Sequence, residues 1–320
     1  MSERRPVTRL TLFVPGTQAS WAEWGPPLAK HGLQLDVGGL SGEGFEEPVG
    51  FTWVEQDGSF AEAFSFGTVE EPVLERLAAA PGALVLPLPF DLRADRERVV
   101  AIVAALREAG AIAVRIEESM LGWDVDRWLE LFSSEDPWAW HRGAVVMLGE
   151  EGKLQSCGMH AFSLPDAYAE GPADEISELV GTLNVYQLAE DPLLLSGQTF
   201  STDAESPRRV LTRWPDLNYP DSHPCHNPYG VWRVGPPGGT AREIPAETPS
   251  FVPALRVMLL AREKKLGRAM TQAEVEEFRD KCPCVMVSQE HAQTLERARG
   301  YADLDPDLVW EQWQAVRAQG

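Results

Sequence analysis

Runs of apolar residues, separated by polar and turn-forming positions, divide the first 235 residues into short strands and helices. Leu10–Val14, Ala83–Leu88 and Ala111–Ile116 are largely apolar, which is typical of strands covered on both faces. Between the last two runs, helical spacing predicts a helix over residues 93–109, marked by Val99, Ile102, Val103 and Leu106. This strand–helix–strand order predicts a parallel pair of strands joined by a crossover.

Turn-forming residues predict two hairpins. Asp57-Gly58 separates two β-rich runs, Val49–Gln56 and Phe60–Phe66, and both residues of such a turn require positive φ. A second hairpin is expected around Glu150–Gly152, between Ala144–Leu148 and Leu154–Met159.

The composition changes after residue 235. The stretch GPPGGTAREIPAETP is rich in proline and glycine, as linkers are. Helical patterns follow it: Thr271 and Glu274 form a capping box for a helix over Gln272–Lys281, and Ser288 caps another over Gln289–Arg299. We therefore expect an α+β fold, a mixed sheet with flanking helices and a small C-terminal helical tail. The expected parts are an α+β core domain (1–235), a linker (236–249) and a C-terminal helical region (250–320).

The charge balance bears on possible partners. The chain carries 28 Lys and Arg residues against 49 Asp and Glu residues, a net charge of −21. A field of this sign repels nucleic-acid phosphates and anionic membrane surfaces, so we expect neither as a partner. It favours a basic protein or a metal cation, although the same charge also serves solubility.

Apolar run length and cysteine usage indicate the compartment. No apolar run approaches the roughly 20 residues that a membrane-spanning helix needs. The apolar run after Arg9 is too short for a secretory signal. Four cysteines in 320 residues form no disulfide framework. We expect reduced thiols and a cytoplasmic location.

A cluster of cysteine and histidine residues is the first candidate for chemistry. Cys157 and His160 are three positions apart, and His223, Cys225 and His226 follow some sixty residues later. Together they offer the ligand types that zinc takes in tetrahedral sites, although the spacing matches no zinc-finger pattern. Cys157 or Cys225 beside a histidine is also a candidate catalytic thiolate. The alternative is a set of buried cysteines and of histidines bonded to loop carbonyls.

Carboxylates provide a further candidate. Glu117 and Glu118 come directly after the strand Ala111–Ile116, and the carboxyl ends of parallel strands are where α/β sheets bind ligands. A solvated strand end is the alternative. Asp166, after Pro165, is expected to cap a turn or a helix.

A proline-rich loop offers a surface for protein partners. Aromatic side chains on loops commonly anchor interfaces. The candidate binding residues of this loop are Trp214, Tyr219, His223, His226, Tyr229 and Trp232. The alternative is that the aromatic residues cover the edge of the core.

The segment GMHAFSLPDA, preceded by AIAVRIEES and WDVDRWLEL, resembles an uncharacterised bacterial domain family of unknown function. Members of that family share a glycine–methionine, aromatic, Leu-Pro-Asp signature, and the resemblance covers residues 80–235. The stretch RGYADLDPDLVWEQW resembles a helical tail seen on many uncharacterised bacterial proteins. The resemblance implies a bacterial, cytoplasmic α/β protein and assigns no catalytic residue.

These observations favour a non-catalytic, acidic binding protein of the cytoplasm, and we expect it to have no cofactor. Its concrete form is an immunity protein that neutralises a basic toxin or effector. The alternative is a metal-dependent hydrolase or small-molecule enzyme that uses the cysteine- and histidine-rich segments, with zinc as its cofactor. A third alternative is a structural subunit of a larger assembly.

Overall fold

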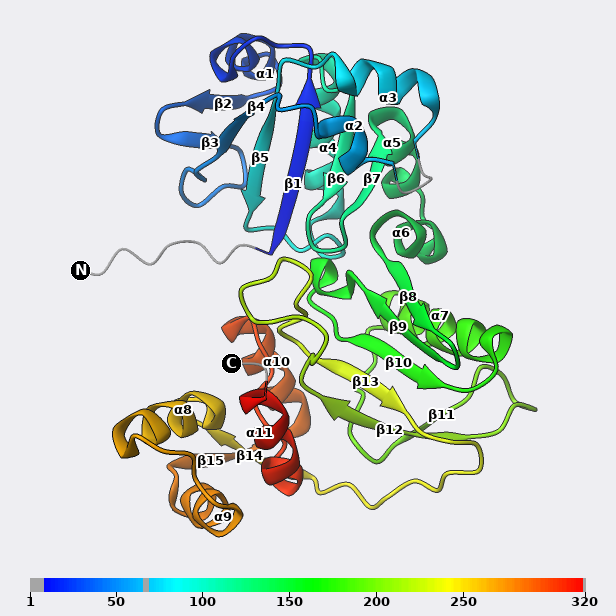
Figure 1. Cartoon of the computed structure of the whole chain (residues 1–320), viewed down its shortest axis with the longest axis vertical. Coiled ribbons are helices and arrows are strands. Elements are labelled where there is room, and N and C mark those ends of the chain that lie inside the picture. Colours follow the sequence, from blue (N-terminus) through cyan, green and yellow to red (C-terminus); the bar gives the residue numbers. More distant parts are fainter. Residues whose placement is uncertain (1–8, 66–68, 319–320) are drawn as a thin grey trace. The chain divides into compact units, whose positions relative to one another are not determined.

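The computed structural model describes residues 9–65 and 69–318, and it confirms the α+β fold. The chain forms two compact units (Figure 1). The first contains the described residues up to Val146 together with Cys157–Ser163, and the second contains Met147–Ser156 and the described residues from Leu164 onward. The boundary between the two units thus lies elsewhere than the linker at 236–249. That residues 1–235 and 250–320 fold separately stays a prediction.

An antiparallel sheet forms the centre of the first unit. The strands of this unit are β1 (Leu10–Gly16), β2 (Leu33–Asp36), β3 (Gly39–Gly42), β4 (Thr52–Glu55), β5 (Gly82–Leu88), β6 (Ala113–Ile116) and β7 (Leu121–Asp124). Its helices are η1 (Trp21–Trp24), α1 (Gly25–Ala29), α2 (Phe60–Ala63), α3 (Glu71–Ala78), α4 (Arg96–Glu108), α5 (Val125–Ser133), α6 (Pro137–Ala144) and η2 (Met159–Phe162). Five strands pair in the order β4-β5-β1-β6-β7, and β2 pairs with β3.

The two strands that the sequence predicts to run parallel are separated in the sheet by a third strand. β1 runs antiparallel to β5, with Val14 opposite Leu84, and antiparallel to β6, with Leu12 opposite Ile116. β5 and β6 therefore point the same way, as the crossover through α4 requires, but β1 lies between them. The two strands therefore run parallel in one sheet as predicted, and β1, which is as apolar as both of them, is buried between them.

The hairpin predicted at Asp57-Gly58 was wrong, because α2 follows the turn. The Asp57 carboxylate accepts a hydrogen bond from Ser59 N at 2.9 Å, which turns the chain before Phe60. Phe60 and Phe64, four positions apart, are buried and lie 5.2 and 6.2 Å from the Phe13 ring. Their spacing suits one face of a helix better than one face of a strand. Phe66 lies outside the described residues.

The second unit contains a mixed sheet and the C-terminal helices. Its strands are β8 (Val146–Glu150), β9 (Lys153–Cys157), β10 (Asp166–Glu170), β11 (Thr199–Phe200), β12 (Arg209–Trp214), β13 (Val231–Val234), β14 (Glu247–Phe251) and β15 (Cys284–Ser288). Its helices are α7 (Ala173–Glu190), α8 (Leu255–Leu266), α9 (Gln272–Lys281), α10 (Gln289–Arg299), η3 (Pro306–Leu308) and α11 (Val309–Arg317). Six strands pair in the order β11-β12-β13-β10-β9-β8, with β10 parallel to β13.

One face of this sheet is buried by α7. The helix and the strands share a cluster of buried apolar residues that includes Leu179, Leu183, Leu211 and Trp232. The strands β8 and β9 are neighbours, as the hairpin pattern predicted. The sequence did not predict the short sheet formed by β14 and β15, because the first of these strands begins in the stretch whose composition is typical of a linker.

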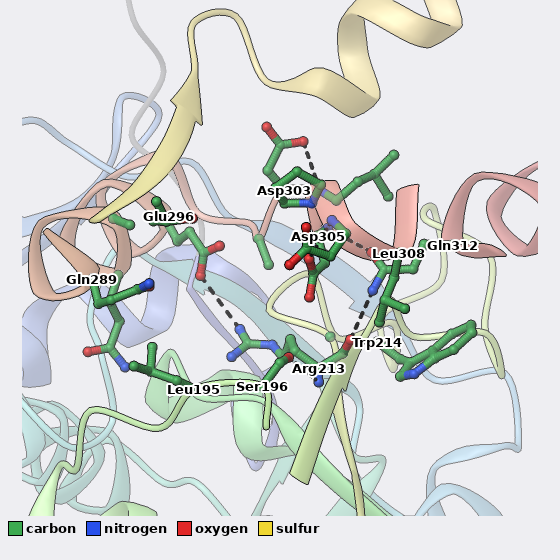
Figure 2. Close-up of a pocket in the computed structure, with 18 of the residues that line it drawn as sticks. Leu195, Ser196, Arg213, Trp214, Gln289, Glu296, Asp303, Asp305, Leu308 and Gln312 are labelled. Atoms are coloured by element: carbon green, nitrogen blue, oxygen red, sulfur yellow. Dashed lines mark hydrogen bonds and ion pairs between the residues drawn. The ribbon is translucent and has the colours of Figure 1, made fainter. Parts of the chain in front are cut away.

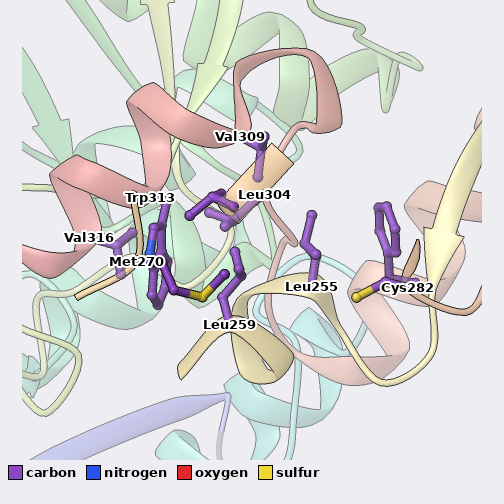
Figure 3. Packing of buried hydrophobic residues seen from close by; sticks show 10 residues of the cluster. Leu255, Leu259, Met270, Cys282, Leu304, Val309, Trp313 and Val316 are labelled. Carbon is purple, nitrogen blue, oxygen red and sulfur yellow. The ribbon is translucent and has the colours of Figure 1, made fainter. Parts of the chain in front are cut away.

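The C-terminal helices enclose a small core of their own within the second unit. Trp313 is fully buried there, beside Leu255, Leu259, Met270 and Val316 (Figure 3). The predicted helices over Gln272–Lys281 and Gln289–Arg299 are confirmed, as is the capping box. No helix in the described ranges is long and apolar enough to cross a membrane.

Replacing Thr271 with alanine is expected to lower the free energy of unfolding by about 1 kcal/mol. Its Oγ1 accepts from Glu274 N at 3.4 Å, and the Glu274 carboxylate accepts from Thr271 N at 2.9 Å, so the change removes half of the capping box. Thr294→Ala is the control, because this hydroxyl bonds only back to Glu290 O within α10 and alanine favours the helix. Urea-induced unfolding measures both variants, and equal losses would contradict the prediction.

Candidate functional site

The predicted aromatic loop connects β12 to β13, and its aromatic residues are buried to different degrees. Tyr229 and Trp232 are buried, and the Trp232 ring belongs to the core under α7. Trp214 and Tyr219 are half-buried. His223 stacks on Tyr219 with ring centroids 4.6 Å apart. Only part of this set therefore offers surface to a ligand, and its binding role stays a prediction.

The five predicted zinc ligands are distributed over both units. Cys157 and His160 are buried in the first unit, at the end of β9 and in η2. In the second unit, His223 Nδ1 accepts from Cys225 N at 3.1 Å, and His226 Nδ1 lies 3.0 Å from Tyr219 O. Within the described ranges, no group of three or more His, Cys, Asp or Glu side chains could hold a metal ion. The zinc site stays a hypothesis that metal analysis would test.

The two glutamates after β6 differ in their surroundings. Glu117 pairs with Arg115, with Nε and Oε1 2.7 Å apart. Glu118 is only 7% exposed, and its Oε1 accepts from Thr11 N at 2.8 Å. Burial raises the pKa of Glu118 to about 7, and its backbone hydrogen bond opposes the shift. Glu118 therefore differs from Glu117 by its burial. Its position after a strand, where α/β sheets bind ligands, is not what distinguishes it.

A buried polar network fixes the aromatic loop to the sheet. Asp166 was expected to cap a turn or a helix, but it is the first residue of β10, and its Oδ1 accepts from Ser156 Oγ at 2.9 Å. Asn227 Nδ2 donates to Asp166 Oδ2 at 2.6 Å and to Leu164 O at 3.0 Å. Asp216 accepts from Asn227 N at 2.9 Å. The loop therefore has one defined conformation although it has no helix or strand of its own.

A pocket of about 520 Å³ lies beside this loop in the second unit. It is lined by the end of β12, by the segment before β14, by α10 and by the residues around η3. Trp214, His226 and Trp232 are the predicted binding residues that line it. The polar groups at its centre come from β12, α10 and the chain after α10 (Figure 2). The described part of the chain thus offers a concave site to which segments far apart in the sequence contribute.

Arg213 is held in this pocket from several sides. Its Nε donates to Tyr229 O at 2.6 Å, and its guanidinium lies 5.0 Å from the centre of the Trp232 ring. Its backbone oxygen accepts from Gln312 Nε2 at 2.9 Å. The guanidinium Nη2 is 3.8 Å from Glu296 Oε2, which is an ion pair beyond hydrogen-bond distance (Figure 2).

Three carboxylates from one short stretch face the same space. Glu296 lies on α10, and Asp303 and Asp305 follow it (Figure 2). Asp303 accepts from Leu255 N at 2.6 Å and from Arg256 N at 3.0 Å, so it caps α8. Asp305 accepts from Asp307 N at 2.9 Å. Glu296 and Asp305 therefore leave acceptor capacity directed at the pocket, while Asp303 is occupied by the helix end.

Burial raises the pKa values of the Glu296 and Asp305 carboxyls. Arg213 opposes the shift at Glu296, and the N–H of Asp307 opposes it at Asp305. The ionised carboxylates are thus less stable than they would be in water. A cation that enters the pocket would stabilise them.

The arginines of the pocket lining already have partners for the most part. The lining contains seven carboxylates and four arginines. Arg256 pairs with Asp221 at 2.5 Å, Arg299 lies 3.6 Å from Asp303, and Arg213 is held as described. The electrostatic balance therefore favours a positively charged ligand over an anion.

No protein-family model, curated protein or solved structure matches this chain. The family resemblance of residues 80–235 therefore stays an expectation. Glu296, Asp303 and Asp305 were not predicted as site residues. Each lies in a charged stretch that reads as a solvated surface, and only their position opposite β12 distinguishes them.

Proposed function

We propose that the chain is a non-catalytic, acidic binding protein that recognises a basic protein partner. In this proposal the pocket of the second unit receives a positively charged side chain of that partner. The observation that carries it is the excess of carboxylates over arginines in the lining, with Glu296 and Asp305 directed at the pocket. A net charge of −21 would attract a basic partner from a distance. Neutralisation of a basic toxin or effector in the bacterial cytoplasm is the biological form that fits.

Asp305→Asn and Glu296→Gln are each expected to weaken binding of a labelled hexa-arginine peptide by about tenfold or more. Each change removes a charge that faces the pocket and keeps an acceptor oxygen, for Asp307 N in one case and for Asp303 N in the other. Fluorescence anisotropy at physiological salt measures the dissociation constants.

Glu311→Gln is the matched control. Glu311 is exposed on α11 and does not line the pocket, yet the variant loses the same unit of charge. We expect less than about a twofold change, because an exposed charge at a distance is largely screened. If the control weakened binding as much as the pocket variants, the peptide would be held by the overall field alone, and the pocket would have no part in recognition.

A further inference from the structure

A proline- and glycine-rich strap, residues 236–246, lies along the pocket of the second unit. It has no helix or strand, but hydrogen bonds hold it in place. Gly238 N and Gly239 N donate to Arg208 O at 2.9 and 3.1 Å, and Arg242 N donates to Gly197 O at 2.9 Å. Gln289 Nε2 donates to Pro245 O at 3.0 Å. The strap is thus attached to the sheet at one end and to α10 at the other.

The strap brings an arginine of the chain itself to the acidic side of the pocket. Arg242 and Asp305 line the same space, and the positive charge of Arg242 opposes the upward shift of the pKa of Asp305. The strap backbone runs close to Gly197, where an added Cβ would lie 3.0 Å from the Cβ of Arg242. A larger residue at position 197 would therefore push Arg242 away from this place.

Arg242 differs from the other arginines of the pocket. Arg213, Arg256 and Arg299 each lie within 4 Å of a carboxylate, which holds them in position. Arg242 is exposed, and it is carried by a segment whose backbone makes few hydrogen bonds. Segments of this kind open at low free energy, so another guanidinium could replace this one.

We propose that Arg242 occupies the place of the partner's arginine in the free protein, and that an arginine-bearing segment of the partner displaces the strap when it binds. This inference rests on the proposed function, and it adds that the group recognised is a guanidinium. A site that is occupied nine-tenths of the time by the chain's own residue has an apparent affinity that is lower by about tenfold. The strap would therefore lower the affinity of every arginine-bearing partner by the same factor, so that only a partner with a high intrinsic affinity stays bound.

Arg242→Gln is expected to tighten binding of the labelled hexa-arginine peptide by about three- to tenfold. Arg262→Gln is the matched control, because it removes the same charge from α8 outside the pocket lining. A similar gain in both variants would show a change in the overall field and would overturn the inference. Asp305→Asn is expected to weaken binding in the native and the Arg242→Gln background alike.

Hydrogen exchange provides the readout that a field effect does not change. In the native protein, addition of hexa-arginine is expected to speed exchange at the amides of Gly238, Gly239 and Arg242, since the strap leaves its hydrogen bonds. Unchanged or slower exchange there would overturn the strap inference. If binding remained sensitive to Asp305→Asn, the proposed function would stand without it. If Asp305→Asn did not weaken peptide binding in the native or the Arg242→Gln background, the strap inference and the proposed function would both be wrong.

Discussion

Replacing Asn227 with alanine is expected to lower the free energy of unfolding of the second unit by about 3–5 kcal/mol. The side chain is 1% exposed, and three of its hydrogen bonds would be lost. Its Nδ2 donates to Asp166 Oδ2 and Leu164 O, and its Oδ1 accepts from Tyr229 N at 2.9 Å. Each lost bond counts for about 1 kcal/mol, and polar groups left buried without this partner add to the loss.

Asn218→Ala is the control for this prediction. Asn218 is exposed in the same loop, and only its backbone N–H bonds to Asp216, an interaction that alanine keeps. We expect a change below about 0.5 kcal/mol. Urea-induced unfolding, followed by tryptophan fluorescence and fitted for two transitions, measures both variants. Similar values for the two would mean that the buried network adds nothing to the stability of the loop.

The hydrogen bonds of Asn227 also show what sequence patterns cannot predict. The strands β1, β5 and β6 were predictable because long apolar runs depend on local composition alone. The order of these strands in the sheet was not predictable, since β1 would be equally buried on either side of β5. β10 was missed because it begins with Asp166, whose carboxyl is satisfied by Ser156 and by Asn227, 61 positions away in sequence. No sequence pattern near Asp166 predicts a hydrogen-bond partner so far away along the chain.

The candidate site was predictable only in its aromatic part. Trp214 and His226 could be singled out because aromatic and histidine residues are unusual in a proline-rich loop. Glu296 and Asp305 lie in stretches where acidic residues are common, and the approach of α10 to β12 gives them their role. The composition of the strap predicts a linker, because proline and glycine indicate that helix and strand are absent but do not indicate the hydrogen bonds of an extended segment.

Two buried groups of the first unit are expected to give opposing pH dependences of stability. The pKa of Glu118 is raised from 4.5 to about 7, so the folded state binds a proton more tightly than the unfolded state. Its contribution to stability is fully present below pH 4.5 and falls as the pH rises to 7. His141 is the reverse: burial lowers its pKa from 6.5 to about 4, and the free energy of unfolding rises with pH over that interval.

These two shifts are of similar size, each worth about 3 kcal/mol, and they nearly cancel between pH 4.5 and 6.5. Glu118→Gln removes one of them. The glutamine keeps an acceptor for Thr11 N and stays neutral, as the protonated glutamate does. Relative to the native protein, the stability of Glu118→Gln is therefore expected to rise by about 3 kcal/mol between pH 4.5 and 7.5, with the two proteins alike at the acid end.

Urea unfolding curves of both proteins at one-unit pH steps measure this difference directly, because every other titrating group contributes equally to the two. Glu46→Gln, which removes the same charge at an exposed position after β3, is the control. A difference between Glu118→Gln and the native protein that stays constant with pH would mean that the Glu118 carboxyl has the same pKa in the folded and unfolded chain. The burial of Glu118 against Thr11 would then have no electrostatic consequence. The free energy of unfolding of the native protein would rise with pH because of His141, with no opposing fall from Glu118.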